Sequence, residues 1–275
     1  KEDTEPILWS DSTKDISLDQ PYFITELGNI HLLAIIIKLK IRGLLTLDQS
    51  ISEILSENEY SGLINIKGKD FTDEVTVSHL LLQRSGIPDF LNHSSKDEPS
   101  IKSRIYSGED LSWSIKDILN NCKDQKANFK PGKSTKSVYS ATNDLLLGKI
   151  IEKITGDSLE KAFHDFHFSR LSMNQTYVYT DIHDRTPALF SYKNHPLILP
   201  LAMSSFGGSG GIVSTARDSL TFLKAFFHGH LFPMSELENL MNWIPVKQGL
   251  RQGIGISHYQ KPRIFPLASK EPEFI

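Results

Sequence analysis

The sequence predicts one globular unit that contains both helices and strands, on three observations. Residues 30–42 are so rich in leucine and isoleucine that a helix there would be apolar around most of its circumference, which predicts a buried central helix. Residues 145–154 repeat apolar positions three and four apart, as a helix with one buried face requires. Residues 7–9 are typical of a short strand. Residues 187–200, which contain prolines, are typical of a partly extended connection.

Composition places the chain among ordinary globular proteins. With 275 residues, of which 39% are apolar and 23% charged, it can bury a large core. Its net charge of −3 gives no reason to expect a nucleic-acid partner. The single cysteine, Cys122, excludes an internal disulfide, and no apolar run is long enough to predict a transmembrane segment.

The first half of the chain adds few regular elements to the central helix. Gly43 ends that helix, and residues 51–55 and 63–66 are short apolar runs. Residues 92–108, rich in Ser, Asp, Lys and Glu, predict a solvated loop, and residues 111–120 predict a short helix.

The second predicted helix follows a turn at Pro131 and Gly132 and begins just after Tyr139. This position fixes the phenol at the N-terminus of a helix, so Tyr139 is the first candidate for a residue that takes part in chemistry. Gly156 ends the helix in the C′ position, and Asp157 is expected to cap the next one. Farther along, Ser214 and Ser235 are the expected N-caps of two more helices.

Three groups of residues resemble the motifs of the penicillin-recognising serine hydrolases, which include class C β-lactamases, D-alanyl-D-alanine carboxypeptidases and related esterases. The first group follows the pattern F-x-P-G, Y-S-N-x-N, L-G-x-I-I-E-x-x-T-G and L-G-M; it consists of Phe129, Pro131, Gly132, Tyr139, Ser140, Ala141, Asn143, Leu147, Gly148, Ile150, Ile151, Glu152, Thr155, Gly156, Leu171, Ser172 and Met173. The other two groups are Thr76 to Pro88 and Gly210 to Asp218. The resemblance covers roughly residues 15–265 in the family's order.

The resemblance implies an α+β fold of the β-lactamase and penicillin-binding-protein kind: a mostly antiparallel sheet flanked by helices, plus a mostly helical region. We expect one domain over residues 1–275, with residues 1–50 and 205–275 forming the sheet-and-helix part and residues 51–204 the helical part. The resemblance also suggests an extracytoplasmic location, while the residues themselves leave the compartment open.

The family's first catalytic element is S-x-x-K at the start of the central helix, where serine and lysine share one helical face. Counting back from Gly43, these positions hold Glu26 and Asn29, and no serine lies between residues 18 and 49. The helix dipole favours a carboxylate at a helix N-terminus, so Glu26 has an adequate structural reason to be there. Asn29 has no titratable proton.

The second element, Y-x-N, is matched by Tyr139 but has Ala141 in place of asparagine. The tyrosine acts as a base only if a nearby cation lowers its pKa from about 10. Because Asn29 replaces the lysine and Glu26 is acidic, we expect Tyr139 to stay protonated and to donate a hydrogen bond. The third element, K-T-G or H-x-G, is expected shortly after residue 270, and the sequence given ends at Ile275.

Other motifs are weaker. Ser158 and Lys161 form the only literal S-x-x-K, on an exposed first turn of a helix. Residues 207–211 match the nucleophile elbow G-x-S-x-G around Ser209, but five small residues are also typical of a turn. The pairs of histidines at residues 164–167 and 228–230 lack a third ligand at a recognisable spacing, so no metal site is predicted.

The leading hypothesis is a member of this family that has lost its acyl-enzyme chemistry and keeps a ligand groove beside Glu26, Asn29 and Tyr139. We expect Ser140, Ala141 and Ser209 to line that groove, a small molecule or peptide to occupy it, and no cofactor. The alternative is an active hydrolase of esters, D-alanyl peptides or β-lactams that uses Glu26 to activate water or Ser209 as nucleophile. The sequence decides neither catalytic activity nor oligomeric state.

Overall fold

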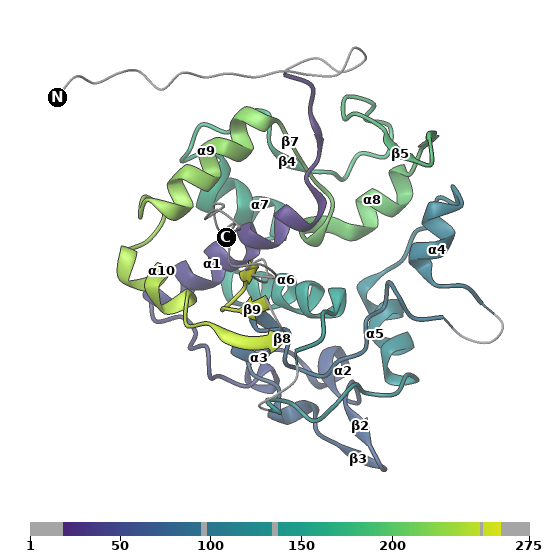
Figure 1. The fold of residues 1–275 in the computed structure, drawn as a ribbon, viewed down its shortest axis with the longest axis vertical. Helices are drawn as coiled ribbons and strands as arrows, with labels where there is room; N and C mark the ends of the chain where they lie inside the picture. Colours follow the sequence, from purple (N-terminus) through teal and green to yellow (C-terminus); the bar gives the residue numbers. More distant parts are fainter. Residues whose placement is uncertain (1–18, 95–97, 134–136, 248–249, 260–275) are drawn as a thin grey trace, which may run out of the picture.

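The computed structural model describes residues 19–94, 98–133, 137–247 and 250–259. The predicted strand at residues 7–9 and the position expected for the third catalytic element lie outside these residues. Two long helices, α1 (Gly28–Ile41) and α6 (Ala141–Thr155), contact each other at the centre of the molecule (Figure 1). The other helices and the sheets surround this pair.

Helix α1 is the buried central helix that the sequence predicts. Seven consecutive side chains, from His31 to Ile37, are buried, so the helix is covered on all sides over its middle turns. Burying this much apolar surface is the main stabilising contribution of the core. The largest buried cluster contains residues from Ile24 to Ile256, and thus from both parts predicted above.

Helix α6 also agrees with the prediction. It ends at Gly156, which has a φ of 72°, a left-handed conformation that costs glycine little. The next helix, α7 (Leu159–Phe163), corrects the predicted cap: the N-cap is Ser158, whose side chain accepts a hydrogen bond from the amide of Lys161, and not Asp157. The literal S-x-x-K therefore stabilises the start of a surface helix.

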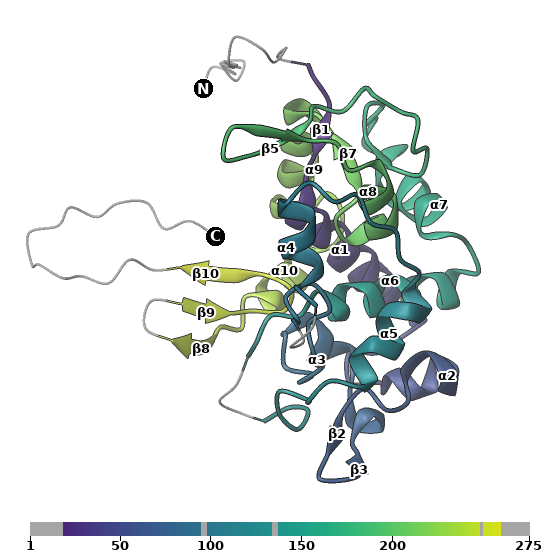
Figure 2. The ribbon, with the colours of Figure 1, turned by 90° about the vertical axis from the view of Figure 1, so that its right-hand side faces the viewer.

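Two small antiparallel sheets confirm the expected pairing. In the first, β7 (Ile212–Ser214) lies between β1 (Tyr22–Phe23) and β4 (Tyr177–Val178), with Val213 opposite both Phe23 and Tyr177. The second is a meander of β8 (Ile244–Lys247), β9 (Leu250–Gln252) and β10 (Ser257–Tyr259), which extends to one side of the helical body (Figure 2).

The remaining elements are short. They are α2 (Glu57–Tyr60), β2 (Asn65–Ile66), β3 (Lys69–Asp70), α3 (Val77–Leu81), α4 (Ile101–Tyr106), α5 (Ile115–Lys123), β5 (Phe190–Tyr192), β6 (His195–Leu197), α8 (Pro200–Phe206), α9 (Ala216–Phe227) and α10 (Met234–Leu240). Within the described residues, no helix combines the length and the apolar character needed to cross a membrane.

Three sequence predictions need correction here. Residues 92–108 were expected to be a loop, but Ser100 caps helix α4, whose Ile105 packs into a small apolar cluster. The N-cap of α9 is Thr215, one residue after Ser214, and that of α10 is Pro233, two residues before Ser235. Ser100 and Thr215 each accept a hydrogen bond from a backbone amide of the helix that they cap, whereas Pro233 makes no such bond, and helix boundaries are poorly determined by local sequence alone.

Candidate functional site

The chain enters α1 through a strained turn. Residues Thr25–Leu27 form one 3₁₀ turn, closed by a hydrogen bond from the amide of Leu27 to the carbonyl of Ile24 at 3.0 Å. Thr25 has a φ of +46°, a left-handed conformation that is unfavourable for a β-branched residue. Glu26 follows with an exposed side chain, and Asn29 lies in the first turn of α1.

The start of α6 is fixed against the loop that follows α3. The hydroxyls of Ser140 and Thr142 both donate to the carbonyl of Pro88, at 3.0 and 2.7 Å. The side-chain oxygen of Gln83 accepts hydrogen bonds from the amide of Ser140 and from the side chain of Asn143. Because these buried polar groups are all paired, the helix start is held rigidly.

Asp144 connects the two helix starts. Its Oδ2 accepts hydrogen bonds from Nδ2 of Asn29 at 3.0 Å and from the hydroxyl of Tyr139 at 3.2 Å. Asp144 is only 4% exposed. Burial raises the pKa of Asp144 to about 7, with smaller contributions in the same direction from Asp89 and Glu26 and opposing ones from the two hydrogen bonds.

Asp144 was not identified from the sequence. The available signal was an acidic residue directly before three leucines in a helix whose later turns are apolar on the buried face. A buried carboxylate almost always has a partner, so this position could have been proposed as part of a polar network. The sequence did not indicate that the partners are Asn29 and Tyr139.

Tyr139 is a donor in this site. Its ring is partly exposed, but its hydroxyl turns inward to Asp144. Burial, followed by the charges of Asp144 and Glu26, raises the pKa of Tyr139 well above its ordinary value. The phenol therefore remains protonated near neutral pH, in the direction expected from the loss of a neighbouring lysine.

A pocket of about 370 Å³ opens beside these residues, a size that suits a small-molecule ligand. Its polar end contains Glu26, Tyr139 and Asp144. Its walls are mostly apolar and come from α4, the hairpin β5–β6 and α8; they include Leu91, Ile105, Tyr106, Phe190, Tyr192, Leu197, Leu199, Met203 and Phe206. The only lysine or arginine among its described lining residues is Lys102.

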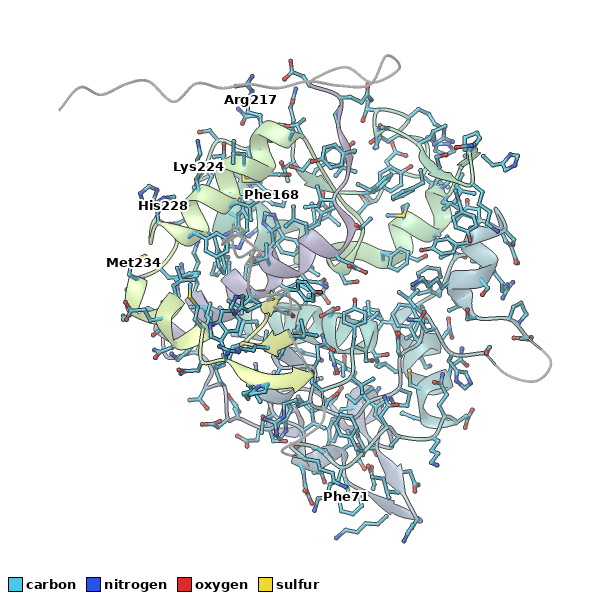
Figure 3. All side chains as sticks on the ribbon, in the orientation of Figure 1. Phe71, Phe168, Arg217, Lys224, His228 and Met234 are labelled. Carbon is cyan, nitrogen blue, oxygen red and sulfur yellow. The ribbon has the colours of Figure 1, made fainter. Side chains whose placement is uncertain are left out.

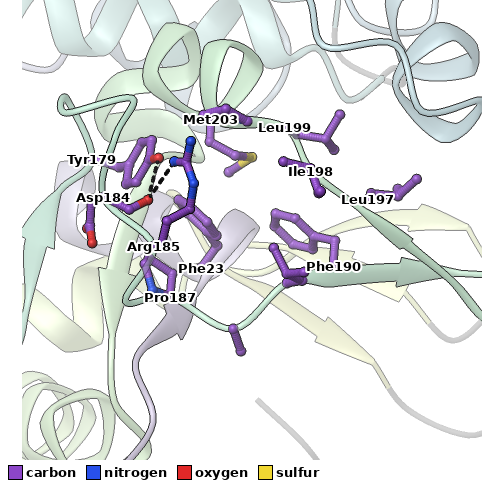
Figure 4. A pocket seen from close by; sticks show the side chains of 13 residues that line it. Phe23, Tyr179, Asp184, Arg185, Pro187, Phe190, Leu197, Ile198, Leu199 and Met203 are labelled. Carbon is purple, nitrogen blue, oxygen red and sulfur yellow. Dashed lines mark hydrogen bonds between the residues drawn. The ribbon is translucent and has the colours of Figure 1, made fainter.

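Two parts of the pocket wall are well defined. The rings of Tyr106 and Tyr192 stack at a centroid distance of 4.6 Å, which connects α4 to β5. Phe190 and Met203 separate the pocket from a much smaller one of about 30 Å³, shown in Figure 4. That smaller pocket has room for about one water molecule and is not a ligand site.

Of the three residues predicted to line the groove, the structure places Ala141 and Ser209 along the pocket. Ser140 is fully buried behind its wall, with its hydroxyl bonded to Pro88. The hydroxyl of Ser209 donates to the carbonyl of Phe206 at 2.8 Å. This hydrogen bond goes to a backbone acceptor, whereas an activated nucleophile donates to a base.

The turn around Ser209 is closely packed. A Cβ atom at Gly208 would lie 2.5 Å from both Leu159 and Phe163. One at Gly28 would lie 3.4 Å from the carbonyl of Gly208, so the turn also sits against the start of α1. The small residues therefore allow close packing at the base of the site. Among residues 19–94, 98–133, 137–247 and 250–259, no group of three or more His, Cys, Asp or Glu side chains is placed to hold a metal ion.

Comparisons with known proteins agree with this fold. The D-stereospecific amidohydrolase from Streptomyces sp. superposes with a TM-score of 0.73 at 22% identity, covering 91% of this chain and 74% of that one. The penicillin-binding protein from Bacillus halodurans superposes with a TM-score of 0.69 at 19% identity, covering 88% and 70%. The D-amino acid amidase from Ochrobactrum anthropi SV3 gives 0.68 at 22% identity, covering 89% and 69%.

The sequence profile of the β-lactamase family matches residues 32–257, which is most of the chain. The match begins just after Glu26 and Asn29 and includes Tyr139 and Asp144. The profile and the fold together confirm the resemblance seen in the motifs. The chain belongs to the β-lactamase family, within the penicillin-recognising serine hydrolases.

Proposed function

We propose that this protein binds a ligand in the 370 Å³ pocket and does not form an acyl-enzyme. The observation that supports this most strongly is the hydrogen bond between Asn29 and Asp144. Asn29 occupies the position of the family's lysine, and its amide is bonded to a buried carboxyl group. The site therefore has neither a serine nor a lysine base at the helix start.

The size of the expected loss of turnover supports the same conclusion. Removing the serine from a comparable catalytic set costs on the order of 10⁶ in turnover. Here the serine and lysine positions are both changed, and Ala141 replaces the asparagine of the second motif. Tyr139, whose pKa is raised, does not supply a replacement base.

The charges of the pocket define the class of ligand. At the two helix starts, Glu26 supplies carboxylate oxygens and Asp144 adds a buried acid group, whereas Lys102, the one cation of the described lining, belongs to α4. Such an end favours a head group that donates hydrogen bonds, above all an ammonium group. The apolar walls and the stacked pair of Tyr106 and Tyr192 suit an aliphatic or aromatic body. We therefore propose a small amine or peptide with a bulky apolar group.

A second candidate function rests on the two carboxyl groups. Burial, with a smaller contribution from Glu26, raises the pKa of Asp144 to about 7, and a carboxyl group that titrates near neutral pH suits general acid–base catalysis with water. In this case the protein would hydrolyse esters or amides without a covalent intermediate. The structural neighbours named as amidases make these bonds the first to test.

An ester- and amide-turnover assay separates the candidates. Ligand binding without catalysis predicts no turnover above background for the wild-type protein. Catalysis through water predicts turnover that Glu26→Gln abolishes and Ser209→Ala leaves intact. Catalysis by Ser209 predicts the reverse pattern. Either form of turnover would contradict the proposed function.

A further inference from the structure

A second pocket, of about 480 Å³, lies at the opposite end of α1 and has no part in the site described above. It is bounded by the last turn of α1, by the π-helical turn His164–Phe168 with the segment after it, and by the loop that follows α9. Its described lining residues are Lys38, Ile41, Arg42, Phe166, Arg170, Leu171, His230, Leu231, Phe232 and Pro233.

The charged groups of this pocket all have the same sign. Lys38, Arg42 and Arg170 line it, and no carboxylate does so among its described lining residues. Within the described part of the chain, none of the three forms an ion pair. The pKa of Lys38 is lowered to about 8, mainly by burial and then by the charges of Arg170 and Arg42. The cations are thus close enough to destabilise one another.

The acidic residues nearest in the chain are engaged elsewhere. Asp165 is paired with Lys161 and bonded to His164. Glu236 is paired with Lys40. The positive charge of the pocket is therefore not neutralised by these neighbours, and an anion would relieve the repulsion.

Hydrogen bonds fix the position of the Lys38 ammonium group. It donates to the carbonyl of Phe166 at 2.7 Å and contacts Nδ1 of the buried His167 at 3.4 Å. Nε2 of His167 lies 3.2 Å from the carbonyl of His31, so Nε2 carries the proton and Nδ1 is an acceptor. Because an ammonium group has three donors, one remains for a ligand.

Arg42 and Arg170 are also positioned. The guanidinium of Arg42 lies over the ring of Phe166, 4.6 Å from its centroid. Nε of Arg170 donates to the carbonyl of Asp165 at 2.9 Å, which leaves its terminal nitrogens available. Guanidinium groups bind the paired oxygens of carboxylates and phosphates well. Apart from His230, the rest of the described lining is apolar, with Ile41, Leu171 and Phe232 among it.

We propose that this pocket is a binding site for a small amphiphilic anion, in which Lys38, Arg42 and Arg170 hold an oxyanion head group and the apolar lining holds an aliphatic or aromatic tail. A carboxylate and a phosphate monoester share this chemistry. The site is independent of the pocket at Glu26.

The test is isothermal titration calorimetry of the full chain with decyl phosphate and with decanoate, below the concentrations at which they form micelles. Wild type should bind at least one of the two with one-to-one stoichiometry, and the better ligand identifies the head group. Decanol, which has the same tail but no charge, should bind about tenfold more weakly or not at all, because it cannot pair with the cations.

The variant Arg42→Gln/Arg170→Gln should weaken anion binding about tenfold or more, since each change removes a charge-assisted hydrogen bond. Both residues are exposed, so the fold should be unaffected. Arg217→Gln/Arg251→Gln is the matched control: it removes the same charge from exposed positions outside the pocket, Arg217 being on α9 (Figure 3). It should change binding less than about twofold.

Several results would overturn the proposal. They are binding of decanol as tight as that of the anions, equal loss of affinity in the two double variants, and no binding of either anion by folded wild-type protein. Binding to anionic vesicles without binding to the monomeric anions would also overturn it, because the surface would then recognise a membrane.

Discussion

The two ends of helix α1 carry pockets of opposite character. At the N-terminal end, Glu26 and Asp144 face the mostly apolar pocket of about 370 Å³. At the C-terminal end, Lys38, Arg42 and Arg170 face a second one. The helix dipole favours both arrangements, because it stabilises negative charge at the N-terminus and positive charge at the C-terminus.

The comparison shows why the sign of the charge alone says little about function. The helix dipole is a sufficient structural reason for the negative charge at one end of α1 and for the positive charge at the other. Exposed charges at helix ends are also common. What distinguishes each pocket is one titratable group that is removed from solvent without an ion pair among the described residues: Asp144 is buried and Lys38 is half-buried, whereas Glu26, Arg42 and Arg170 are exposed. The pKa of Asp144 is raised to about 7 and that of Lys38 is lowered to about 8, so each charged form is destabilised in the folded protein.

The largest expected effect concerns the acidic end. Unfolded Asp144 ionises near 3.8 and the folded group near 7, so between these values the native state holds a proton that the unfolded state has released. The free energy of unfolding should therefore fall as pH rises from about 4 to 7, by at most about 4 kcal/mol. Urea denaturation at several pH values measures this.

Asp144→Asn removes the titration and should flatten this part of the profile. Asp124→Asn, at an exposed position, is the control and should leave the slope unchanged. If Asp144→Asn keeps the wild-type slope, the carboxyl group is ionised in the native protein at acidic pH. The contrast between the two ends of α1 would then be wrong.

The second effect concerns the packing behind the acidic end. Gly208→Ala should destabilise the protein by about 1–3 kcal/mol, because the added Cβ would lie 2.5 Å from Leu159 and Phe163. Ser209→Ala, one residue later, should cost only about 0.5–1.5 kcal/mol, the value of one hydrogen bond. Thermal or chemical denaturation compares the two. Equal stability of Gly208→Ala and wild type would show that the turn moves freely.

The smallest expected effect on stability concerns the C-terminal end of α1, where stability should change with pH in the opposite direction. Between about pH 8 and 10.5 the unfolded state holds a proton on Lys38 that the native state has lost. Stability should therefore rise with pH across this window by about 1–2 kcal/mol, a value reduced because solvent partly screens the group. Lys38→Gln should abolish the rise, and Lys116→Gln on α5 should not. A wild-type profile that matches Lys38→Gln would show that Lys38 is not perturbed.

The sequence predicts the scaffold of this molecule better than its sites. The extent of α1 and α6 follows from apolar spacing and from Gly156, because these signals are local and strong. The network of Asp144, Asn29 and Tyr139 joins residues up to 115 positions apart, which no local pattern reports. The resemblance marked the positions of Glu26, Asn29 and Tyr139 but did not include Asp144.

The cationic pocket escaped prediction for the same reason. Lys38 and Arg42 read as ordinary basic residues at a helix C-terminus, and Arg170 as an exposed one. Only the packing of the segment around Phe166 against α1 brings them together. The burial of His167 likewise depends on this contact, whereas the sequence allowed either a solvated or a packed histidine.

The most direct test of the central claim is intact-mass spectrometry of the folded protein after incubation with a fluorophosphonate and, separately, with a penicillin. An active serine hydrolase treated in parallel confirms that the reagents work. The proposal that Glu26 and Asn29 stand in place of the family's serine and lysine predicts an unchanged mass with both reagents. A stoichiometric adduct that maps to a single residue would contradict the account and would identify a nucleophile in another position.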